Sequence, residues 1–519
     1  MIPFSTALVT SLVTLFLCVH FNLWLSYAIL EHRTYKKPNI IIILADDMGW
    51  GDLGANIASE TATTPNLEKM ASKGLRLVDF HSAASTCSPS RASLLTGRLG
   101  IRNGVTHNFA ITSLGGLPLN ETTLADVLKE SGYITGLIGK WHLGHHGPYH
   151  PNLRGFHYYY GIPYSNDMGC LDTAGYNLPP CPPCPQSLRE PPYWSKGGCN
   201  TKLGLPLMEN SQILDQPVDL NSLASRYADK ATGFIRDAKA RGMPYFLYVA
   251  LAHMHVPLSV APTRTPYKDS MQEMDWLIGQ IIANADHNTL VWFTGDNGPW
   301  AEKCDLAGST GPFIGAWQTA QGGSAAKRTT WEGGHRVPTI VYWPEVVPEN
   351  KTSSALLSIL DIFPTIVTLT NSTLPANRKF DGIDISAILR GRAHKGHQIL
   401  YHPNSGAGGQ FGNIEAIRLG PYKAFYTTGG ALSCDGKIGP ERHHNPPLVF
   451  NIERDPREGK PLEASSVEFQ QVLPLIEDAI SAIHENVRKD NVSTADYSQD
   501  MSAIICCNPR HIVCRCTEQ

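Results

Sequence analysis

The sequence predicts an α/β fold, with a large, mostly parallel sheet flanked by helices and a smaller α+β domain at the C-terminal end. Residues 39–44 read Asn-Ile-Ile-Ile-Ile-Leu, an unbroken apolar and β-branched run that is typical of a strand buried on both faces of a sheet. Strand patterns then alternate with helical patterns as far as residue 294, which is the order found in doubly wound sheets. After Gly391 the strand patterns become shorter and are separated by Gly- and Pro-rich turns.

Each expected element follows from a local pattern. Apolar runs predict further strands of the large sheet over 134–138, 245–252 and 290–294. Helical patterns predict helices over 64–74, 122–132 and 223–240. The C-terminal part should hold strands over 398–402, 416–418, 422–427 and 448–452, and a helix over 469–487. We therefore expect a large domain over residues 37–392 and a smaller domain over 393–519 that ends in a cysteine-rich tail.

Length and charge limit the classes of partner. A chain of 519 residues exceeds the usual size of a single core. The formal net charge is -3 and the sequence contains no long run of like charge, so we expect no nucleic acid partner. An anionic substrate would have to be attracted by a local group of cations instead.

The N-terminal segment has the composition of a secretory signal. Residues 7–30 are almost uniformly apolar, which predicts a signal peptide within residues 1–30 and no stable membrane contact after its cleavage. An uncleaved anchor is the alternative, because the segment is long enough to span a bilayer and basic residues follow it rather than precede it. Entry into the secretory pathway is also favoured by glycosylation acceptors of the form Asn-X-Ser/Thr at Asn120, Asn350, Asn371 and Asn491.

The cysteines favour an oxidising compartment, and their odd count outside the signal leaves one cysteine without a disulfide partner. Of the 12 cysteines, Cys18 lies in the predicted signal, and setting Cys87 aside as well leaves ten that can pair completely. One buried free cysteine elsewhere would explain the odd count equally well. A Pro-rich insert would form a stapled surface loop, with Cys170–Cys199 and Cys181–Cys184 as one nested arrangement.

Oxygen ligands follow two of the predicted strands. Asp46 and Asp47 come directly after the first strand, and Asp296 and Asn297 follow the strand over 290–294. Carboxylate and amide oxygens suit Ca²⁺ or Mg²⁺ rather than a structural zinc. Each pair alone is more simply a helix cap or turn, but two pairs at the strand ends of one sheet favour a metal site.

Basic side chains also follow the strands or precede a glycine-containing loop: Lys140 and His142, His253 and His255, and Lys327 with Arg328. Residues two apart in extended backbone point the same way, so Lys140 with His142, and His253 with His255, can each present both side chains to one site. Any one of these residues is more simply a solvated or hydrogen-bonded group. Together around a metal, they describe a site for a tetrahedral oxyanion such as sulfate or phosphate.

Cys87 opens a predicted helix. Pro89 fits a first helical turn, so the thiol would lie at the amino end of the helix, where unpaired amides and the dipole would stabilise a thiolate. Sulfur is nevertheless a soft ligand beside hard ones. A hard metal among carboxylates would be better matched by an oxygen nucleophile.

These residues resemble a known family. Cys87-Ser-Pro-Ser-Arg91 followed by Leu95-Thr-Gly-Arg98 is similar to the signature of the sulfatases, in which the cysteine is converted to formylglycine by the formylglycine-generating enzyme in the endoplasmic reticulum. The aldehyde hydrates to a geminal diol, which is an oxygen nucleophile. The resemblance runs from about Lys37 to the end of the chain and includes Leu44–Asp52, Gly139–Gly144, Gly161–Asp167, Ala252–Pro257, Thr294–Gly298 and Lys327–Gly334.

The resemblance implies an alkaline-phosphatase-like fold, a catalytic domain over 37–392, one bound Ca²⁺ and hydrolysis of sulfate esters, including aryl sulfates in vitro. Gly144-His-His-Gly147 and the tail with Cys506-Cys507 and Cys514-Arg-Cys516 resemble one lysosomal branch of the family. For that branch the implied substrate is a glycosaminoglycan, heparan sulfate, at 3-O-sulfated N-sulfoglucosamine. The implied location is the lysosome, reached through the secretory pathway.

The resemblance also implies a role for each candidate residue. Calcium would be held by Asp46, Asp47, Asp296, Asn297 and the modified Cys87. Arg91 would hold the formylglycine hydrate, and Lys140 would bridge it to the substrate sulfate. His142 would help to deprotonate the second hydroxyl, so that the sulfated intermediate collapses to aldehyde and free sulfate. The sulfate would contact Lys140, Ser165, His255 and Lys327, and one of the last two would assist the leaving alcohol.

Two alternatives stay open on the sequence alone. A phosphohydrolase or phosphodiesterase of the same superfamily would use Ser or Thr as nucleophile and further His or Asp ligands for a second metal. A noncatalytic glycan-binding protein could retain the scaffold, because the segment 273–289 is about four residues shorter than is usual in the family. Ala325 also stands where another sulfatase has a cysteine, which leaves Cys434 to pair with Cys304 or to stay free.

Overall fold

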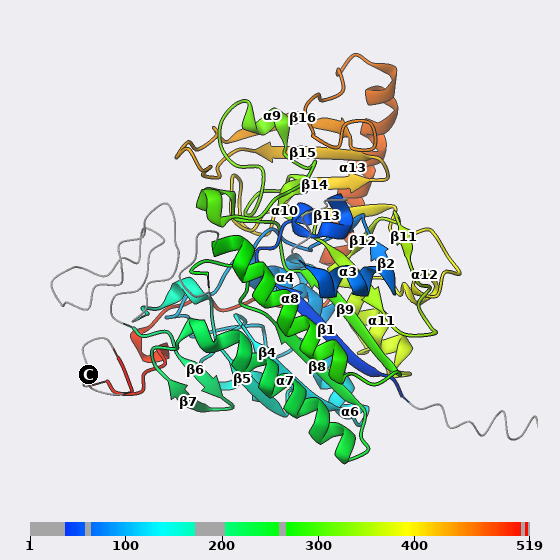
Figure 1. Cartoon of the computed structure of the whole chain (residues 1–519). Helices are drawn as coiled ribbons and strands as arrows, with labels where there is room; N and C mark the ends of the chain where they lie inside the picture. The colour runs from blue at the N-terminus through cyan, green and yellow to red at the C-terminus, as the bar shows by residue number, and fades with distance from the viewer. Residues whose placement is uncertain (1–36, 58–63, 172–202, 259–265, 510–513, 517–519) are drawn as a thin grey trace, which may run out of the picture. The chain divides into compact units, whose positions relative to one another are not determined.

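A ten-stranded mixed sheet carries the candidate site, with the strand order β11-β2-β10-β9-β1-β8-β4-β5-β6-β7 (Figure 1). Its central strands run parallel: β9 (Thr289–Gly295), β1 (Asn39–Ala45), β8 (Tyr245–Ala250), β4 (Ile134–Gly139) and β5 (Tyr158–Gly161). Both margins contain antiparallel pairs, formed by β10 (Thr339–Tyr342) and β2 (Leu75–Leu77), and by β6 (Leu207–Glu209) and β7 (Gln212–Asp215). Strand β11 (Lys351–Ser353) closes the first margin parallel to β2. The predicted large sheet is confirmed, with a parallel centre.

The computed structural model describes residues 37–57, 64–171, 203–258, 266–509 and 514–516. The predicted signal within 1–30 and the cysteines Cys181, Cys184 and Cys199 lie outside these ranges. From Asn39 onward, the described residues belong to one compact unit, so the expected boundary after residue 392 stays a prediction. No helix within the described ranges combines the length and the apolar character that crossing a membrane requires.

The side chains of β1 alternate between the two faces of the sheet, and helices cover both faces. Ile40 and Ile42 pack into one core, whereas Ile41 and Ile43 pack into the other. The first core includes residues of α4 (Cys87–Thr96), α6 (Leu124–Glu130) and α11 (Ile362–Leu369). The second includes residues of α3 (Pro65–Ser72), α7 (Leu223–Ala240) and α8 (Pro266–Asn284). Because all of β1 is buried, an apolar run without polar alternation is the pattern that this position requires.

The short connection before β9 leaves that strand in register. Helix α8 ends at Asn284, and β9 begins at Thr289. Strand β9 then pairs with β1 over its whole length, from Asn39 opposite Thr289 to Ala45 opposite Gly295. The residues that follow the two strands therefore meet at one edge of the sheet, and the shortened segment does not displace Asp296.

A second, four-stranded antiparallel sheet forms the C-terminal part, in the order β13 (Ile399–Pro403), β14 (Ile414–Leu419), β15 (Tyr422–Thr428) and β16 (Arg442–Asn451). Helix α13 (Val467–Arg488) packs on it, and Ser466 caps the helix by accepting from the Phe469 N–H. Trp331, which precedes α10 (Glu332–His335), packs against Phe425 and Phe450 of this sheet. The expected α+β region is confirmed.

Three disulfides lie within the described residues: Cys304–Cys434, Cys506–Cys514 and Cys507–Cys516. The first joins the loop after β9 to the loop that follows β15, across 130 residues. Of the two outcomes left open for Cys434, pairing with Cys304 is therefore confirmed. The other two disulfides staple the tail, and Cys87 stands outside the framework with a free, buried thiol.

A buried charged network joins the large sheet to the C-terminal sheet. Glu332 accepts from Lys423 of β15 at 2.8 Å and from Arg336 at 2.6 Å. Glu458 lies against it and accepts from the Glu332 backbone N–H at 3.2 Å. Burial, assisted by the charge of Glu332 and opposed by Lys423, raises the pKa of Glu458 to about 8.

This raised pKa predicts a loss of stability as the pH rises. The pKa of about 8 lies above the usual Glu value of 4.5, so the folded chain holds this proton more tightly than the unfolded chain. The resulting stabilisation is complete below the lower value and is lost as the pH rises through the upper one. We measure the free energy of unfolding with denaturant at pH 5 and at pH 8. The fall between these two values is expected to be about 1–3 kcal/mol smaller in Glu458→Gln than in wild type. The exposed Glu463→Gln is the matched control, and equal losses in wild type and Glu458→Gln would contradict the assignment.

Candidate active site

Cys87 is the first residue of α4, and every residue of that helix is buried. Pro89 lies in its first turn, and the helix ends at Gly97, whose φ of 66° suits a left-handed cap. The Cys87 thiol faces the Asp46 Oδ1 at 3.5 Å and accepts from Lys140 Nζ at 3.3 Å. Burial and the charge of Asp46 raise the pKa of the Cys87 thiol well above its usual range. The expectation of a thiolate stabilised by the helix end is therefore wrong for this site.

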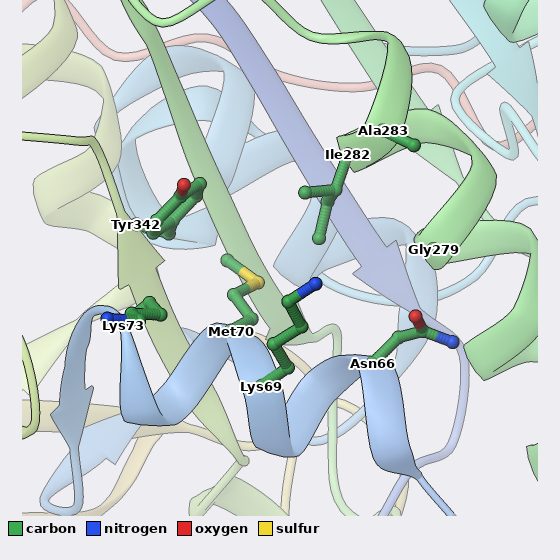
Figure 2. Close-up of a pocket in the computed structure, with 8 residues that line it drawn as sticks. All are labelled: Asn66, Lys69, Met70, Lys73, Gly279, Ile282, Ala283 and Tyr342. Atoms are coloured by element: carbon green, nitrogen blue, oxygen red, sulfur yellow. The ribbon is translucent and has the colours of Figure 1, made fainter.

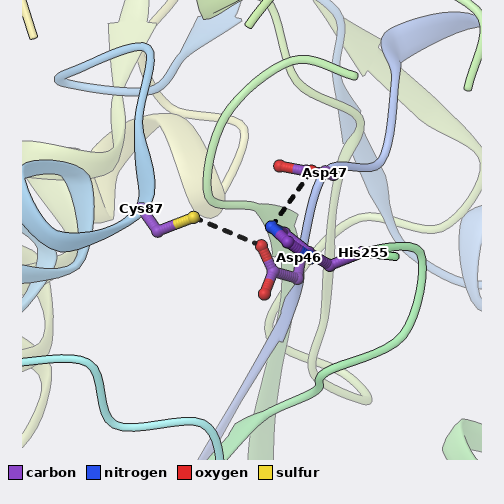
Figure 3. Close-up of side chains that lie close together, drawn as sticks. All are labelled: Asp46, Asp47, Cys87 and His255. Atoms are coloured by element: carbon purple, nitrogen blue, oxygen red, sulfur yellow. Dashed lines mark hydrogen bonds and ion pairs between the residues drawn. The ribbon is translucent and has the colours of Figure 1, made fainter. Parts of the chain in front are cut away.

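The two predicted pairs of oxygen ligands meet at one edge of the sheet, because β1 and β9 are parallel neighbours. The Asp47 backbone N–H donates to Asp296 Oδ1 at 3.2 Å. The Asn297 Nδ2 group donates to Asp47 Oδ1 at 2.7 Å. Figure 3 shows the Cys87 sulfur pointing toward Asp46, with Asp47 and His255 beside them.

Three buried cations face these carboxylates. Lys140 donates to Asp46 Oδ2 at 2.6 Å, and Lys327 lies 2.5 Å from Asp47 Oδ1. Arg91 donates twice to Asp296 Oδ2, at 3.0 Å and 2.8 Å, and its Nη1 donates to the Lys140 carbonyl at 3.0 Å. Burial disfavours the Asp46 carboxylate, but Lys140 outweighs that penalty together with the neighbouring cations, so the pKa of Asp46 is well below its usual range.

The acidic residues fit a hard divalent cation. Burial, followed by the charge of Asp46, raises the pKa of Asp296 to about 6, and Arg91 and Lys140 oppose this shift. Asn297 Oδ1 is buried and has no hydrogen-bond partner among the described residues. Ligand atoms of Asp46, Asp47, Cys87 and His255 lie within 4.8 Å of one another. Because the donors are mostly carboxylate and amide oxygens, the set suits Ca²⁺ or Mg²⁺.

His142 and His255 each engage a main-chain carbonyl with one ring nitrogen. His142 Nε2 lies 3.1 Å from the Phe109 carbonyl oxygen, which can only accept, so this nitrogen carries the proton. The His142 Nδ1 is buried and finds no hydrogen-bond partner in the described part of the chain. Burial, followed by the charge of Lys140, holds the pKa of His142 well below its usual range. His142 is thus a neutral imidazole whose Nδ1 can accept a proton.

His255 and Ser165 complete the group. His255 Nδ1 donates to the Val256 carbonyl at 2.6 Å, and its Nε2 lies 3.4 Å from Ser165 Oγ. The Ser165 hydroxyl in turn accepts from Lys140 Nζ at 3.1 Å. The structure therefore brings together the residues to which the family resemblance assigns a role in catalysis, substrate binding or metal binding.

His253 does not join the group. Its ring Nε2 lies 3.5 Å from Glu273 of α8, whereas that of His255 lies 3.6 Å from Asp47, and the His253 carbonyl accepts from the Asp46 N–H. The intervening Met254 has a φ of 78°, so the backbone is not extended and the two histidines diverge. The predicted pairing of His253 with His255 is wrong for this reason.

Trp300 is a site residue that the sequence did not single out. Its ring lies 5.3 Å from the His255 ring and 4.6 Å from Lys327 Nζ, so it forms a wall beside these two groups. The signal in the sequence is weak, because an aromatic residue shortly after a strand is far more often part of a core.

The glycosylation acceptors Asn120, Asn350, Asn371 and Asn491 are all exposed.

Two other features of the described residues carry no comparable chemistry. A hollow of about 180 Å³ lies between α3, α8 and β10, where Lys69, Lys73 and Tyr342 line it, and none of the predicted site residues reaches it (Figure 2). Asp79, His81 and Glu332 form a second group of potential metal ligands. That group offers two carboxylates and one histidine, and Asp79 and Glu332 pair with Arg418 and Arg336, so it has fewer oxygen donors than the three carboxylates and one amide after β1 and β9.

Comparisons with known proteins agree on one family. The Sulfatase family model matches residues 38–372, and a model described as the C-terminal region of aryl-sulfatase matches residues 395–516. Arylsulfatase G of Homo sapiens is 62% identical over 491 residues, which cover 93% of this chain and 93% of that protein. Arylsulfatase A of Homo sapiens is 35% identical over 518 residues, covering 93% of this chain and 96% of that protein. The crystal structure of PsFucS1 sulfatase from Pseudoalteromonas sp. matches with a TM-score of 0.74 and 27% identity, covering 90% of this chain and 93% of that one.

Proposed function

We infer the reaction from one premise: this chain belongs to the sulfatase family, has its alkaline-phosphatase-like fold and is a sulfuric ester hydrolase that resembles arylsulfatase G. We propose that hydrolysis occurs at residue 87, through a formylglycine that the formylglycine-generating enzyme makes from Cys87, with one Ca²⁺ beside it. The observation that carries the proposal is the position of Cys87, fully buried between Asp46 and Lys140. Because burial disfavours the thiolate there, the unmodified thiol is a poor nucleophile.

Calcium would be held by Asp46, Asp47, Asp296, Asn297 and the modified residue 87. When bound, this cation would orient the nucleophile and favour its deprotonated form, while the hydrated aldehyde would supply two hydroxyl groups on one carbon. Arg91 is held by two hydrogen bonds to Asp296 and one to the Lys140 carbonyl, so its guanidinium is fixed next to residue 87. We assign it the role of orienting that residue.

The substrate sulfate would bind against Lys140, Ser165, His255 and Lys327. Lys140 and Ser165 are 3.1 Å apart, and Ser165 and His255 are 3.4 Å apart, so their polar atoms can all reach one tetrahedral group. The two ammonium groups neutralise the charge of that group as its bond to the alcohol breaks. Both are already held by carboxylates, so little reorganisation is needed when the substrate enters.

Proton transfer would fall to His142 and to the groups on the other side of the sulfate. His142 presents an unprotonated Nδ1, which suits a base that removes a proton from the second hydroxyl of residue 87 and so releases the sulfate. His255 or Lys327 would assist the leaving alcohol. His255 donates its Nδ1 proton to the Val256 carbonyl and burial lowers its pKa, whereas Lys327 stays protonated beside Asp47, so the ammonium of Lys327 is the better source of that proton.

The site chemistry argues against both alternatives. A phosphohydrolase of the superfamily would place Ser or Thr where Cys87 stands and would hold a second metal beside the first. The only other group of candidate ligands in the described ranges, Asp79, His81 and Glu332, shares no residue with the site. A noncatalytic protein would have no reason to keep Asp46, Lys140 and Ser165 in contact around residue 87.

We propose heparan sulfate, at 3-O-sulfated N-sulfoglucosamine, as the natural substrate, and the lysosome, reached through the secretory pathway, as the location. Resemblance to arylsulfatase G supports both parts of this proposal. The four exposed glycosylation acceptors and the disulfides support passage through an oxidising, glycosylating compartment.

Removal of the metal with a chelator should show what Ca²⁺ contributes to activity and stability, apart from the protein residues of the site. Protein from a secretory host is expected to release sulfate from 4-nitrophenyl sulfate at acidic pH, and EGTA should reduce the rate at least tenfold and lower the unfolding temperature. Ca²⁺ should restore both, since it would bind the oxygens of Asp46, Asp47, Asp296 and Asn297, and Asn297 Oδ1 has no other hydrogen-bond partner among the described residues. Asn297→Ala should need more Ca²⁺ for the same recovery, with the exposed Asn377→Ala as control. Protein that carries formylglycine but hydrolyses no sulfate ester would contradict the proposed function, and indifference to EGTA would contradict the calcium.

A further inference from the structure

Trp300 ends the loop that leaves the site after β9, and its ring borders the place proposed for the sulfate. One side of the ring approaches His255, at 5.3 Å between ring centroids. Its indole N–H donates to Glu302 Oε2 at 3.0 Å, which fixes the ring orientation. The residue is 8% exposed, so it is a rigid wall rather than a mobile side chain.

Three cations surround this one ring. Lys303 Nζ lies 4.3 Å from the centroid, Lys327 Nζ 4.6 Å and the Arg328 guanidinium carbon 5.2 Å. Lys327 forms a close ion pair with Asp47, at 2.5 Å. Lys303 and Arg328 form longer ion pairs with the same carboxylate, that of Glu302, at 3.5 Å and 3.9 Å. The Glu302 carboxylate therefore faces two cations at distances too long for tight pairing, which leaves positive charge at the rim.

Arg328 is the member of this group that solvent can reach. Its side chain is 44% exposed, whereas those of Lys303 and Lys327 are each 4% exposed. Its φ of 77° is unfavourable for a residue with a side chain, and it is maintained because the Arg328 N–H donates to the Ser85 carbonyl at 2.8 Å. Gly406 covers it so closely that an added Cβ would lie 2.9 Å from the Arg328 Cβ. The chain thus fixes two adjacent cations so that Lys327 is buried in the site and Arg328 is open at its rim.

We propose that Arg328, supported by the Trp300 ring and by the charge of Lys303, forms a second anion subsite at the rim of the catalytic pocket. It binds a sulfate, sulfamate or carboxylate group on the same molecule whose other sulfate is cleaved. A guanidinium presents two parallel N–H donors that match such planar or tetrahedral oxyanions, and stacking on an indole keeps it oriented. The subsite rests on the proposed function, because it requires the cleaved sulfate to lie against Lys327.

The consequence is a preference for substrates that carry two anionic groups. A simple aryl sulfate would use only the buried cations, whereas a sulfated sugar with a neighbouring anion would also engage Arg328. Because this contact exists before and during bond breaking, it should act mainly on KM.

Steady-state kinetics of Arg328→Gln and Arg328→Lys would test the subsite. The probes are an O-sulfated glucosamine with an N-sulfate, the same sugar with an N-acetyl group, an O-sulfated disaccharide with a uronate, and 4-nitrophenyl sulfate. Arg328→Gln is expected to lower the preference in kcat/KM for the doubly over the singly charged substrates about tenfold, almost entirely through KM. Arg328→Lys should keep part of the preference, and comparison of the N-sulfate with the uronate shows which anion is bound. Arg241→Gln, an exposed arginine elsewhere, is the matched control.

An unchanged preference in Arg328→Gln would overturn the proposal, as would an equal fall in kcat for every substrate. Failure of the proposed function has a different signature, because wild-type protein would then hydrolyse none of the probes. In that case, calorimetric binding of the N-sulfated sugar to Cys87→Ala and to the double variant with Arg328→Gln still decides the subsite. The double variant is expected to bind about tenfold more weakly, and equal affinity would overturn the proposal.

Discussion

Cys87→Ala is expected to lose sulfate ester hydrolysis by on the order of 10⁴-fold or more in kcat. The proposed cation, the sulfate-binding lysine and the orienting arginine all converge on this side chain, so its removal leaves a binding site without a nucleophile. Asp46 and Lys140 contact each other directly at 2.6 Å, so their pairing does not depend on the sulfur. We therefore expect the unfolding temperature to change little. The measurement is release of 4-nitrophenol from its sulfate at acidic pH, together with thermal unfolding.

The matched control for this variant is the unaltered chain made without the formylglycine-generating enzyme. It should fold with a thiol at residue 87 and be as inactive as Cys87→Ala. In active protein, mass spectrometry should find the tryptic peptide Leu77–Arg91 lighter than its thiol form, because an aldehyde has replaced the thiol. Activity in Cys87→Ala, or active wild type that contains only cysteine, would refute the nucleophile.

Lys140→Ala should produce the second large effect, a fall of about 10³-fold in kcat/KM. Its ammonium contacts Asp46 at 2.6 Å, the Cys87 sulfur at 3.3 Å and Ser165 at 3.1 Å, so it links the metal ligands, the nucleophile and the sulfate pocket. The variant also leaves the buried Asp46 carboxylate with less positive charge around it. Breaking such a buried pair typically costs about 3–5 kcal/mol of stability.

Lys140→Arg distinguishes the catalytic role from the structural one. It keeps the charge beside Asp46 and should recover most of the lost stability, but its planar guanidinium cannot reproduce the three contacts of an ammonium, so kcat/KM should stay at least about 10²-fold below wild type. Lys129→Ala, on the exposed end of α6, should behave as wild type. The formylglycine content of each preparation must be matched. Near-normal kcat/KM in Lys140→Arg would show that only the charge matters.

Much of the site could be predicted from the sequence, because the carboxyl ends of parallel strands lie at the same edge of a sheet. The run before Asp46 is unmistakable as a doubly buried strand, and the pattern before Asp296 is similar. The residues that follow parallel strands lie at one edge of the sheet. Two pairs of oxygen ligands, Asp46-Asp47 and Asp296-Asn297, therefore had to lie close together if their strands were neighbours. The structure adds that β1 and β9 are directly paired, which no local pattern encodes.

The parts that could not be predicted depend on single backbone angles and on distant contacts. His253 and His255 were expected to point together, and the positive φ of Met254 separates them. Trp300 gains its role from the cations that other segments place around it, and the sequence shows none of those approaches. The raised pKa of the Cys87 thiol is likewise a result of tertiary burial, followed by the charge of Asp46, which no local pattern encodes.

The complete burial of α4 imposes an order of events during biosynthesis. Residues 87–96 have no face open to solvent in the folded protein, so no second enzyme could reach the thiol without unfolding the helix and much of the core around it. The proposed conversion of Cys87 must therefore be finished while the segment is still an unfolded chain. On the proposed mechanism, folding and modification would compete, and a molecule that folds first would keep its thiol and be inactive. The specific activity of a preparation would then depend on the fraction of molecules in which Cys87 was converted before folding, as well as on the chemistry of the site.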